Sequence, residues 1–176
     1  MTRAPTIAVL LTLSAVLGFT QAEALPLGFR SLRLGAPIEE VKLELAADTT
    51  FAYRGDPDVS LLPLDQQQII ETEGRRFIRR AFFQFFEDRL YTITLRLDES
   101  ELDFYTMYTA LTEKYGEPTA LDPQEVVWES EDVRFSLERP LTVKYVDLPV
   151  FNRRIAEQRE GESMDEFTRQ QFIDQF

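Results

Sequence analysis

Apolar residues first gather in an uninterrupted run near the N-terminus. After Arg3, the segment 7–19 carries no charge over 13 residues, whereas a helix needs about 20 apolar residues to cross a bilayer. Ala22-Glu23-Ala24 then supplies the small residues that a signal peptidase recognises. We therefore predict a secretory signal peptide at 1–24 and a mature chain that begins at Leu25.

Beyond this run, helical and strand periodicities alternate along the chain. Residues 29–34 have the pattern of a strand, and the apolar residues that follow recur at the spacing of a helix over 37–46. Residues 48–65 contain one glycine and two prolines without a sustained period, which predicts a long loop. Further strands are predicted at 67–72, 77–86 and 90–97.

The strands at 77–86 and 90–97 predict a hairpin with many aromatic residues. If Asp88 and Arg89 form its two-residue turn, strict alternation decides which side chains share a face. The residues assigned to the helix-covered face are then Phe82, Phe86, Tyr91, Ile93 and Leu95, and those assigned to the reverse face are Phe83, Phe85 and Leu90, beside Thr92 and Thr94.

An apolar reverse face requires either a cover or a partner. Its candidate partner-binding residues are Phe83, Phe85 and Leu90. The charged tail at 149–176, predicted to form two short helices, adds the candidates Phe167, Phe172 and Phe176. Either these tail residues cover the reverse face within the same chain, or the face stays open as a docking surface. We favour the open surface.

The second half repeats the order of a helix followed by antiparallel strands. Ser100 and Asp103 are spaced as a capping box at the start of a helix, which Gly116 would end. Strands are predicted at 125–130, 133–139 and 141–147, with Trp128 opposite Phe135 across a tight turn.

Together these patterns predict an α+β fold. Two helix-then-antiparallel-meander units form one helix-backed antiparallel sheet, and a helical tail follows. The predicted domains are the signal peptide at 1–24, the α+β domain at 25–148 and the charged helical tail at 149–176.

Net charge and the missing residue types limit the function. The formal net charge is −12, and removal of 1–24 leaves it unchanged because that segment holds one arginine and one glutamate. Such a chain disfavours nucleic acid and anionic lipid as partners. The sequence has no cysteine and no histidine, which excludes disulfides, a lipid anchor on cysteine, thiol nucleophiles and histidine-based triads. We therefore expect no catalytic residues and no cofactor.

Two groups of charged residues, acidic pairs and an arginine cluster, are further candidates for a function. Asp56 with Asp58, or Glu129 with Glu138, could serve a carboxylate-based or Ca²⁺-dependent hydrolase, which is the alternative function. The basic cluster consists of Arg75, Arg76, Arg79 and Arg80. Strand alternation is expected to divide this cluster between the two faces, where it would protect a sheet edge.

Two short segments carry a resemblance to known proteins. The residues Leu-Gly-Ala-Pro-Ile-Glu-Glu-Val at 34–41 resemble the start of the first helix in small bacterial envelope proteins of the BamE/SmpA and beta-lactamase-inhibitor-protein-like type. The Phe-Glu-Asp-Arg-Leu segment at 86–90 is similar to their hairpin turn, although Arg89 replaces the usual glycine. The resemblance implies an exported binding or assembly module of the bacterial cell envelope, periplasmic or secreted, whose partner is another envelope protein.

Overall fold

The computed structural model describes residues 22–61 and 67–173, and the predicted signal peptide lies mostly outside them. Its strands are β1 (Gly28–Phe29), β2 (Leu32–Arg33), β3 (Val59–Leu61), β4 (Gln67–Glu73), β5 (Ile78–Phe86), β6 (Arg89–Leu97), β7 (Ala120–Leu121), β8 (Glu125–Glu129), β9 (Val133–Glu138) and β10 (Thr142–Asp147). Its helices are α1 (Ile38–Ala47), the 3-10 turn η1 (Asp56–Asp58), α2 (Phe104–Tyr115) and α3 (Leu148–Ile173). The chain has the α+β fold that the sequence predicts.

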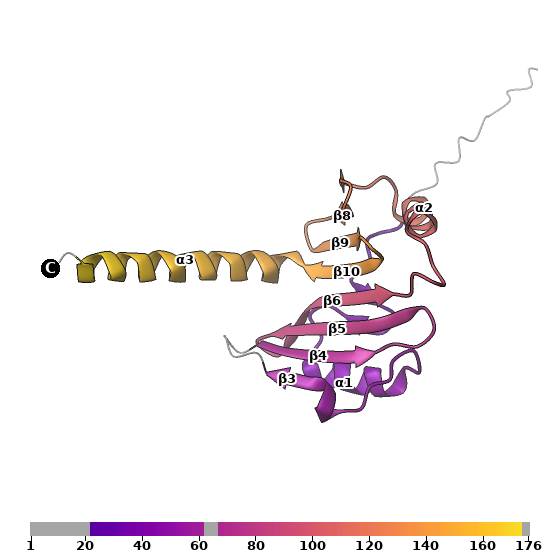
Figure 1. The fold of residues 1–176 in the computed structure, drawn as a ribbon, viewed down its shortest axis with the longest axis horizontal. Coiled ribbons are helices and arrows are strands. Elements are labelled where there is room, and N and C mark those ends of the chain that lie inside the picture. The colour runs from indigo at the N-terminus through magenta and orange to yellow at the C-terminus, as the bar shows by residue number, and fades with distance from the viewer. Residues whose placement is uncertain (1–21, 62–66, 174–176) are drawn as a thin grey trace, which may run out of the picture.

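Eight of the strands form one antiparallel sheet in the order β3-β4-β5-β6-β10-β9-β8-β7 (Figure 1). Each half of this sheet is a meander that follows one helix, α1 or α2. The halves meet where β6 pairs with β10, with Ile93 opposite Tyr145 and Leu95 opposite Val143. The short edge strands β3 and β7 were not predicted; β3 and η1 lie within the segment expected to be a loop.

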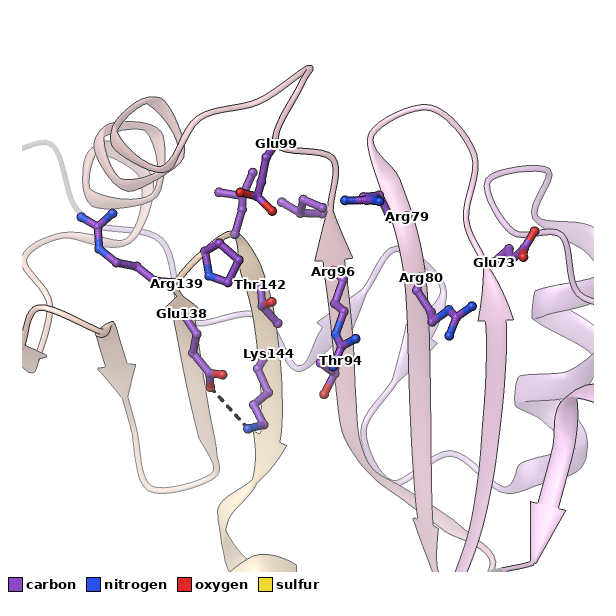
Figure 2. Close-up of a pocket in the computed structure, with 13 residues that line it drawn as sticks. Glu73, Arg79, Arg80, Thr94, Arg96, Glu99, Glu138, Arg139, Thr142 and Lys144 are labelled. Carbon is purple, nitrogen blue, oxygen red and sulfur yellow. Dashed lines mark hydrogen bonds and ion pairs between the residues drawn. The ribbon is translucent and has the colours of Figure 1, made fainter.

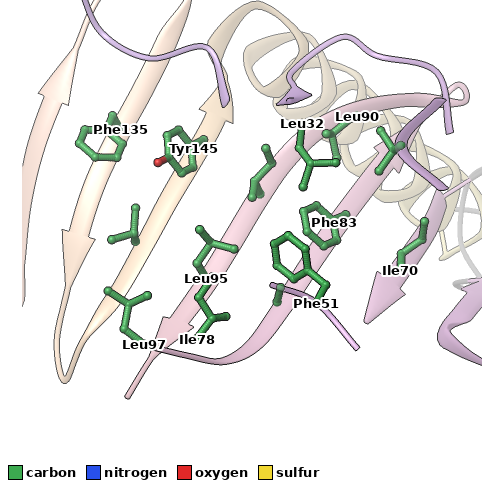
Figure 3. Packing of buried hydrophobic residues seen from close by; sticks show 14 of the residues in the cluster. Leu32, Phe51, Ile70, Ile78, Phe83, Leu90, Leu95, Leu97, Phe135 and Tyr145 are labelled. Carbon is green, nitrogen blue, oxygen red and sulfur yellow. The ribbon is translucent and has the colours of Figure 1, made fainter. Parts of the chain in front are cut away.

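One face of the sheet is buried under α1 and α2. Ile38, Val41 and Leu45 give α1 a buried stripe at helical spacing, and aromatic side chains of α2 pack on the second half. Phe83 meets the ring of Phe51 edge to face at 5.6 Å between ring centroids, within the cluster drawn in Figure 3. The predicted core side of the second unit is confirmed, with Trp128 opposite Phe135.

Helix α2 begins later than the predicted capping box. The carboxylate of Asp103 caps the helix by accepting a hydrogen bond from the Thr106 amide at 2.9 Å. Ser100, four residues before the first residue of the helix, instead donates a hydrogen bond to Asp98. The hydroxyl and amide of Thr106 hold the pKa of Asp103 below its usual value.

The hairpin of β5 and β6 differs from the predicted register in two ways. Its turn residues are Glu87 and Asp88, both with positive φ angles of 49° and 59°, and Phe86 pairs with Arg89. A β-bulge near the turn then adds Tyr91 to β6, so that Gln84 pairs with Thr92 and Phe83 with Ile93. Both changes alter which side chains share a face.

The predicted face assignment is therefore confirmed for Ile93 and Leu95, which lie in the core, and wrong for the other apolar residues of the hairpin. Phe83, Phe85 and Leu90 are completely buried in the core under the helices. Phe82, Phe86 and Tyr91 lie on the reverse face instead; the last two are the ones that contact α3. Because they are buried, the three core residues form no docking surface. The bulge shifts the alternation by one residue, which strict alternation does not allow for.

The C-terminal tail is one continuous helix rather than two. Helix α3 leaves β10 and extends away from the sheet (Figure 1). Near its start, the guanidinium of Arg154 lies 5.2 Å from the ring centroid of Phe86 and 5.0 Å from that of Tyr91. Burial raises the pKa of the Tyr91 hydroxyl, which accepts a hydrogen bond from Arg154.

The described contacts between α3 and the reverse face come from arginines near the start of the helix. Phe172 is 60% exposed near the end of α3, whereas Arg153 and Arg154 make the contacts with the reverse face. The side chain of Phe167 and all of Phe176 lie outside the described residues. The start of the helix therefore docks through arginines. The sequence pattern did not identify them; cover by the tail phenylalanines was one of its two alternatives, and an open face was favoured.

Candidate ligand-binding site

The reverse face of the sheet carries a polar groove over its central strands. The groove has a volume of about 770 Å³ and crosses from β4 to β9 (Figure 2). It is lined by Glu73, Arg79, Arg80, Thr94, Arg96, Leu97, Glu99, Glu138, Arg139, Pro140, Leu141, Thr142 and Lys144. We call it the arginine groove.

A second β-bulge brings two arginines of β5 to the same face. Ile78 pairs with Leu97 and Arg80 with Arg96, so Arg79 is the additional residue. Ile78 and Ala81 on either side are 5% and 0% exposed, which directs both arginines away from the core. The expected division of Arg79 and Arg80 between two faces is therefore wrong.

The rest of the predicted basic cluster takes no part in the groove. Arg75 and Arg76 lie in the turn between β4 and β5, where Arg76 has a φ angle of 56°. Neither residue lines the groove. Arg80 forms an ion pair with Glu71 on the adjacent strand at 2.8 Å between nitrogen and oxygen.

Arg96 occupies the centre of the groove on β6. Its backbone neighbours across the strands are Arg80 on β5 and Thr142 on β10. The guanidinium stacks over the ring of Phe82 at 5.1 Å from the centroid. Within the described ranges, neither Arg96 nor Arg79 takes part in an ion pair. Both guanidiniums therefore retain hydrogen-bonding capacity for a ligand.

Lys144 supplies a further cation on β10. Its ammonium group forms an ion pair with Glu138 at 3.3 Å, and Figure 2 shows it on the strand next to that of Arg96. Ser136 donates a hydrogen bond to the same carboxylate at 3.1 Å. These contacts fix Glu138 at one side of the groove. Thr94 lies across from Lys144 on β6.

The groove is basic although the chain is acidic. Its charged lining consists of Arg79, Arg80, Arg96, Arg139 and Lys144 against Glu73, Glu99 and Glu138, while the whole chain carries −12. Arg139 is already engaged, because its guanidinium stacks on Phe104 at 4.1 Å and donates to the Pro123 carbonyl oxygen. The arrangement is suited to holding anionic groups by charge-assisted hydrogen bonds.

Three of the four candidate hydrolytic carboxylates, Asp58, Glu129 and Glu138, are held in ion pairs. Asp58 is buried and accepts hydrogen bonds from the Arg54 guanidinium and backbone amide at 2.6 and 2.9 Å. Glu129 pairs with Arg134 at 3.3 Å, at the other end of the β8–β9 ladder from Glu138. In the described part of the chain, no group of three or more acidic residues is placed to hold a metal ion.

Sequence reasoning missed the central residues of this groove. The sequence pattern places Thr94 on the reverse face, but it does not identify Arg96 or Lys144, because an isolated charge in a strand is typical of any solvated face. One signal was present: alternation would have placed either Arg79 or Arg80 in the core. Since a buried unpaired guanidinium is costly, the doublet itself indicates a bulge.

Comparison with known proteins identifies the family. No helix in ranges 22–61 and 67–173 is long and apolar enough to cross a membrane. Neither the curated proteins nor the solved structures contain a match to this chain. The family model of the TP0088 domain matches residues 27–157, which include the whole sheet, both covering helices and the docked start of α3. The chain therefore belongs to the TP0088 domain family.

Proposed function

We propose that this protein is an exported, non-catalytic binding module of the bacterial cell envelope. Its partner is another envelope protein, which docks on the reverse face of the sheet at the arginine groove. The observation that carries this proposal is the position of Arg96, held on Phe82 at the centre of an exposed basic surface. A guanidinium stacked on an aromatic ring is a recurrent means of binding anionic groups.

Two features of the sequence support export and an envelope role. The N-terminal segment has the length and small-residue end of a signal peptide. The segment 34–41 resembles the start of the first helix of BamE/SmpA-type envelope proteins, and it leads into α1. Both features favour a periplasmic or secreted location.

The ion pairs of the acidic residues favour binding over hydrolysis. A glycoside hydrolase needs two carboxyl groups that flank one reacting bond. Here Glu138 is paired with Lys144, and Glu129 with Arg134. Recognition of an anionic partner is therefore the chemistry that the geometry supports best.

Export predicts a defined mature N-terminus. The protein recovered outside the cytoplasm of its own host should begin at Leu25, because Ala22 and Ala24 are the small residues that precede the expected cleavage position. N-terminal sequencing of the recovered protein measures this directly. A recovered chain that still carries residues 7–19 would contradict the proposed processing.

Docking at the arginine groove predicts a specific loss of partner capture. The Arg96→Glu variant should recover its partner from the native envelope at about one-tenth of the wild-type yield, because the central cation becomes a repelling anion. Quantitative mass spectrometry of affinity-purified material provides the measurement. Arg33→Glu is the matched control, since Arg33 is exposed on β2, outside the groove.

The thermal melt of both variants must accompany the capture experiment. Arg96 is an exposed residue whose new carboxylate would face Arg80, so we expect the variant to fold as the wild type does. A folded Arg96→Glu variant with an unchanged set of captured proteins would rule out the groove as the docking surface.

A further inference from the structure

We propose that the arginine groove recognises a pair of carboxylates on an acidic peptide segment of its partner. This inference rests on the proposed function and adds the chemistry of the ligand. It follows from the placement of Arg80, Arg96 and Lys144 on three adjacent strands, and from the acidic residues that surround them.

Two like charges lie side by side at the centre of the sheet. Arg80 and Arg96 are direct neighbours across β5 and β6, an arrangement that is destabilising when both side chains carry the same charge. Glu71 neutralises Arg80, while Arg96 is oriented by Phe82. An anion bound at Arg96 would relieve the remaining repulsion, because its negative charge lies next to both guanidiniums.

The cations of the groove are spread over three adjacent strands. Adjacent strands lie about 4.8 Å apart, so the strands of Arg80 and Lys144 are separated by about 10 Å. Lys144 lies diagonally from Arg96 across the β6–β10 pair. Arg80 is paired with Glu71 on β4 and Lys144 with Glu138 on β9, so their charged groups are held on opposite sides and one small anion is poorly placed to contact both. Two carboxylates two residues apart in an extended peptide, about 7 Å from each other, can do so.

The acidic residues around the groove limit the number of charges that the ligand can carry. Glu73, Glu99 and Glu138 line the same groove, and the chain has a net charge of −12. A long polyanion would meet these carboxylates and the acidic surface beyond them. A short segment with two carboxylates meets fewer of these acidic groups, since screening limits the range of interactions between charges to about 8 Å at physiological salt. The hydroxyls of Thr94 and Thr142 can accept hydrogen bonds from its backbone amides.

The test measures binding of defined probes to the purified mature protein. The probe is the blocked pentapeptide Gly-Glu-Gly-Glu-Gly, and its control is Gly-Gln-Gly-Gln-Gly. Chemical-shift titration should show the acidic peptide shifting resonances of the groove strands, with affinity that falls as salt is raised. Arg96→Gln should weaken binding about tenfold, as expected for the loss of a charge-assisted contact. Arg33→Gln should bind as the wild type does.

Three outcomes would overturn the inference. These are equal binding of the glutamine peptide, unchanged affinity in Arg96→Gln, and inorganic phosphate competing as tightly as the acidic peptide. The last outcome would assign the groove to a single oxyanion. The result is independent of partner capture: if Arg96→Glu abolishes capture but no peptide binds, the ligand chemistry is wrong and the proposed function stands. If the peptide binds but capture is unaffected, the proposed function fails.

Discussion

Phe83→Ala is expected to lower the free energy of unfolding by about 3–5 kcal/mol, as is usual for loss of a large buried aromatic side chain. Phe83 is completely buried and lies against Phe51 beneath α1. The shortened side chain would leave a cavity on a central strand, where the pairing with β4 and β6 prevents collapse. Urea denaturation followed by circular dichroism measures the loss.

The neighbouring residue provides the matched control. Phe82 is half-buried on the reverse face under Arg96, so Phe82→Ala should cost at most about 2 kcal/mol because less area returns to water. The same variant should weaken binding of the acidic peptide, since Arg96 loses the ring that orients it. Equal losses of stability in the two variants would contradict the bulged register, and a larger loss for Phe82→Ala would support strict alternation.

Trp128→Ala is expected to destabilise the second half by a similar amount, about 3–5 kcal/mol. Trp128 is 1% exposed and packs against Phe135 at 5.7 Å between ring centroids. Its indole nitrogen donates a hydrogen bond to the carbonyl oxygen of Gly116 at 2.8 Å. Because Gly116 ends α2, this bond joins the helix to the sheet as well as filling the core.

Trp128→Phe separates the hydrogen bond from the packing. The phenylalanine ring retains much of the buried volume but leaves the Gly116 carbonyl oxygen without its donor, at a cost of about 1–3 kcal/mol. Thermal and urea denaturation of the two variants give the comparison. Identical losses for Trp128→Phe and Trp128→Ala would show that the hydrogen bond, rather than the volume, accounts for the stability.

The second half of the sheet was predictable because its strands alternate without interruption. Val126 and Trp128 face Leu137 and Phe135 in the structure, as a period of two requires. Arg134 and Glu138 take the opposite face, where each forms an ion pair. Apart from the buried pair Val127 and Ser136 on that face, hydrophobic burial and polar solvation agree along this hairpin, so one register satisfies both.

The first half could not be assigned in this way because aromatic residues occur on both faces. In the run Phe82-Phe83-Gln84-Phe85-Phe86, apolar side chains can supply the core in either register. The choice depends on bulges at Arg79 and Tyr91, which add a residue without a strong local signature. The register is decided by contacts between residues distant in sequence, among them the packing of Phe51 on Phe83.

The candidate site could not be predicted from the sequence, because it depends on the same bulged register. A basic cluster was noticed, but Arg79 and Arg80 share a face only because of the bulge. Arg96 and Lys144 are 48 residues apart in the sequence, and they approach each other only through the β6–β10 pairing. No local pattern could reveal a site that depends on the joining of two meanders.

The pairing of β6 with β10 also determines when the groove forms during synthesis of the chain. Three of its cations, Arg79, Arg80 and Arg96, belong to the first meander, while Lys144 belongs to β10, the last strand of the sheet to leave a ribosome or a translocation channel. A nascent chain that ends before β10 exposes the β6 edge and presents an incomplete groove. Competence for the ligand would therefore appear at the same moment as closure of the sheet, so that partners encounter only finished molecules.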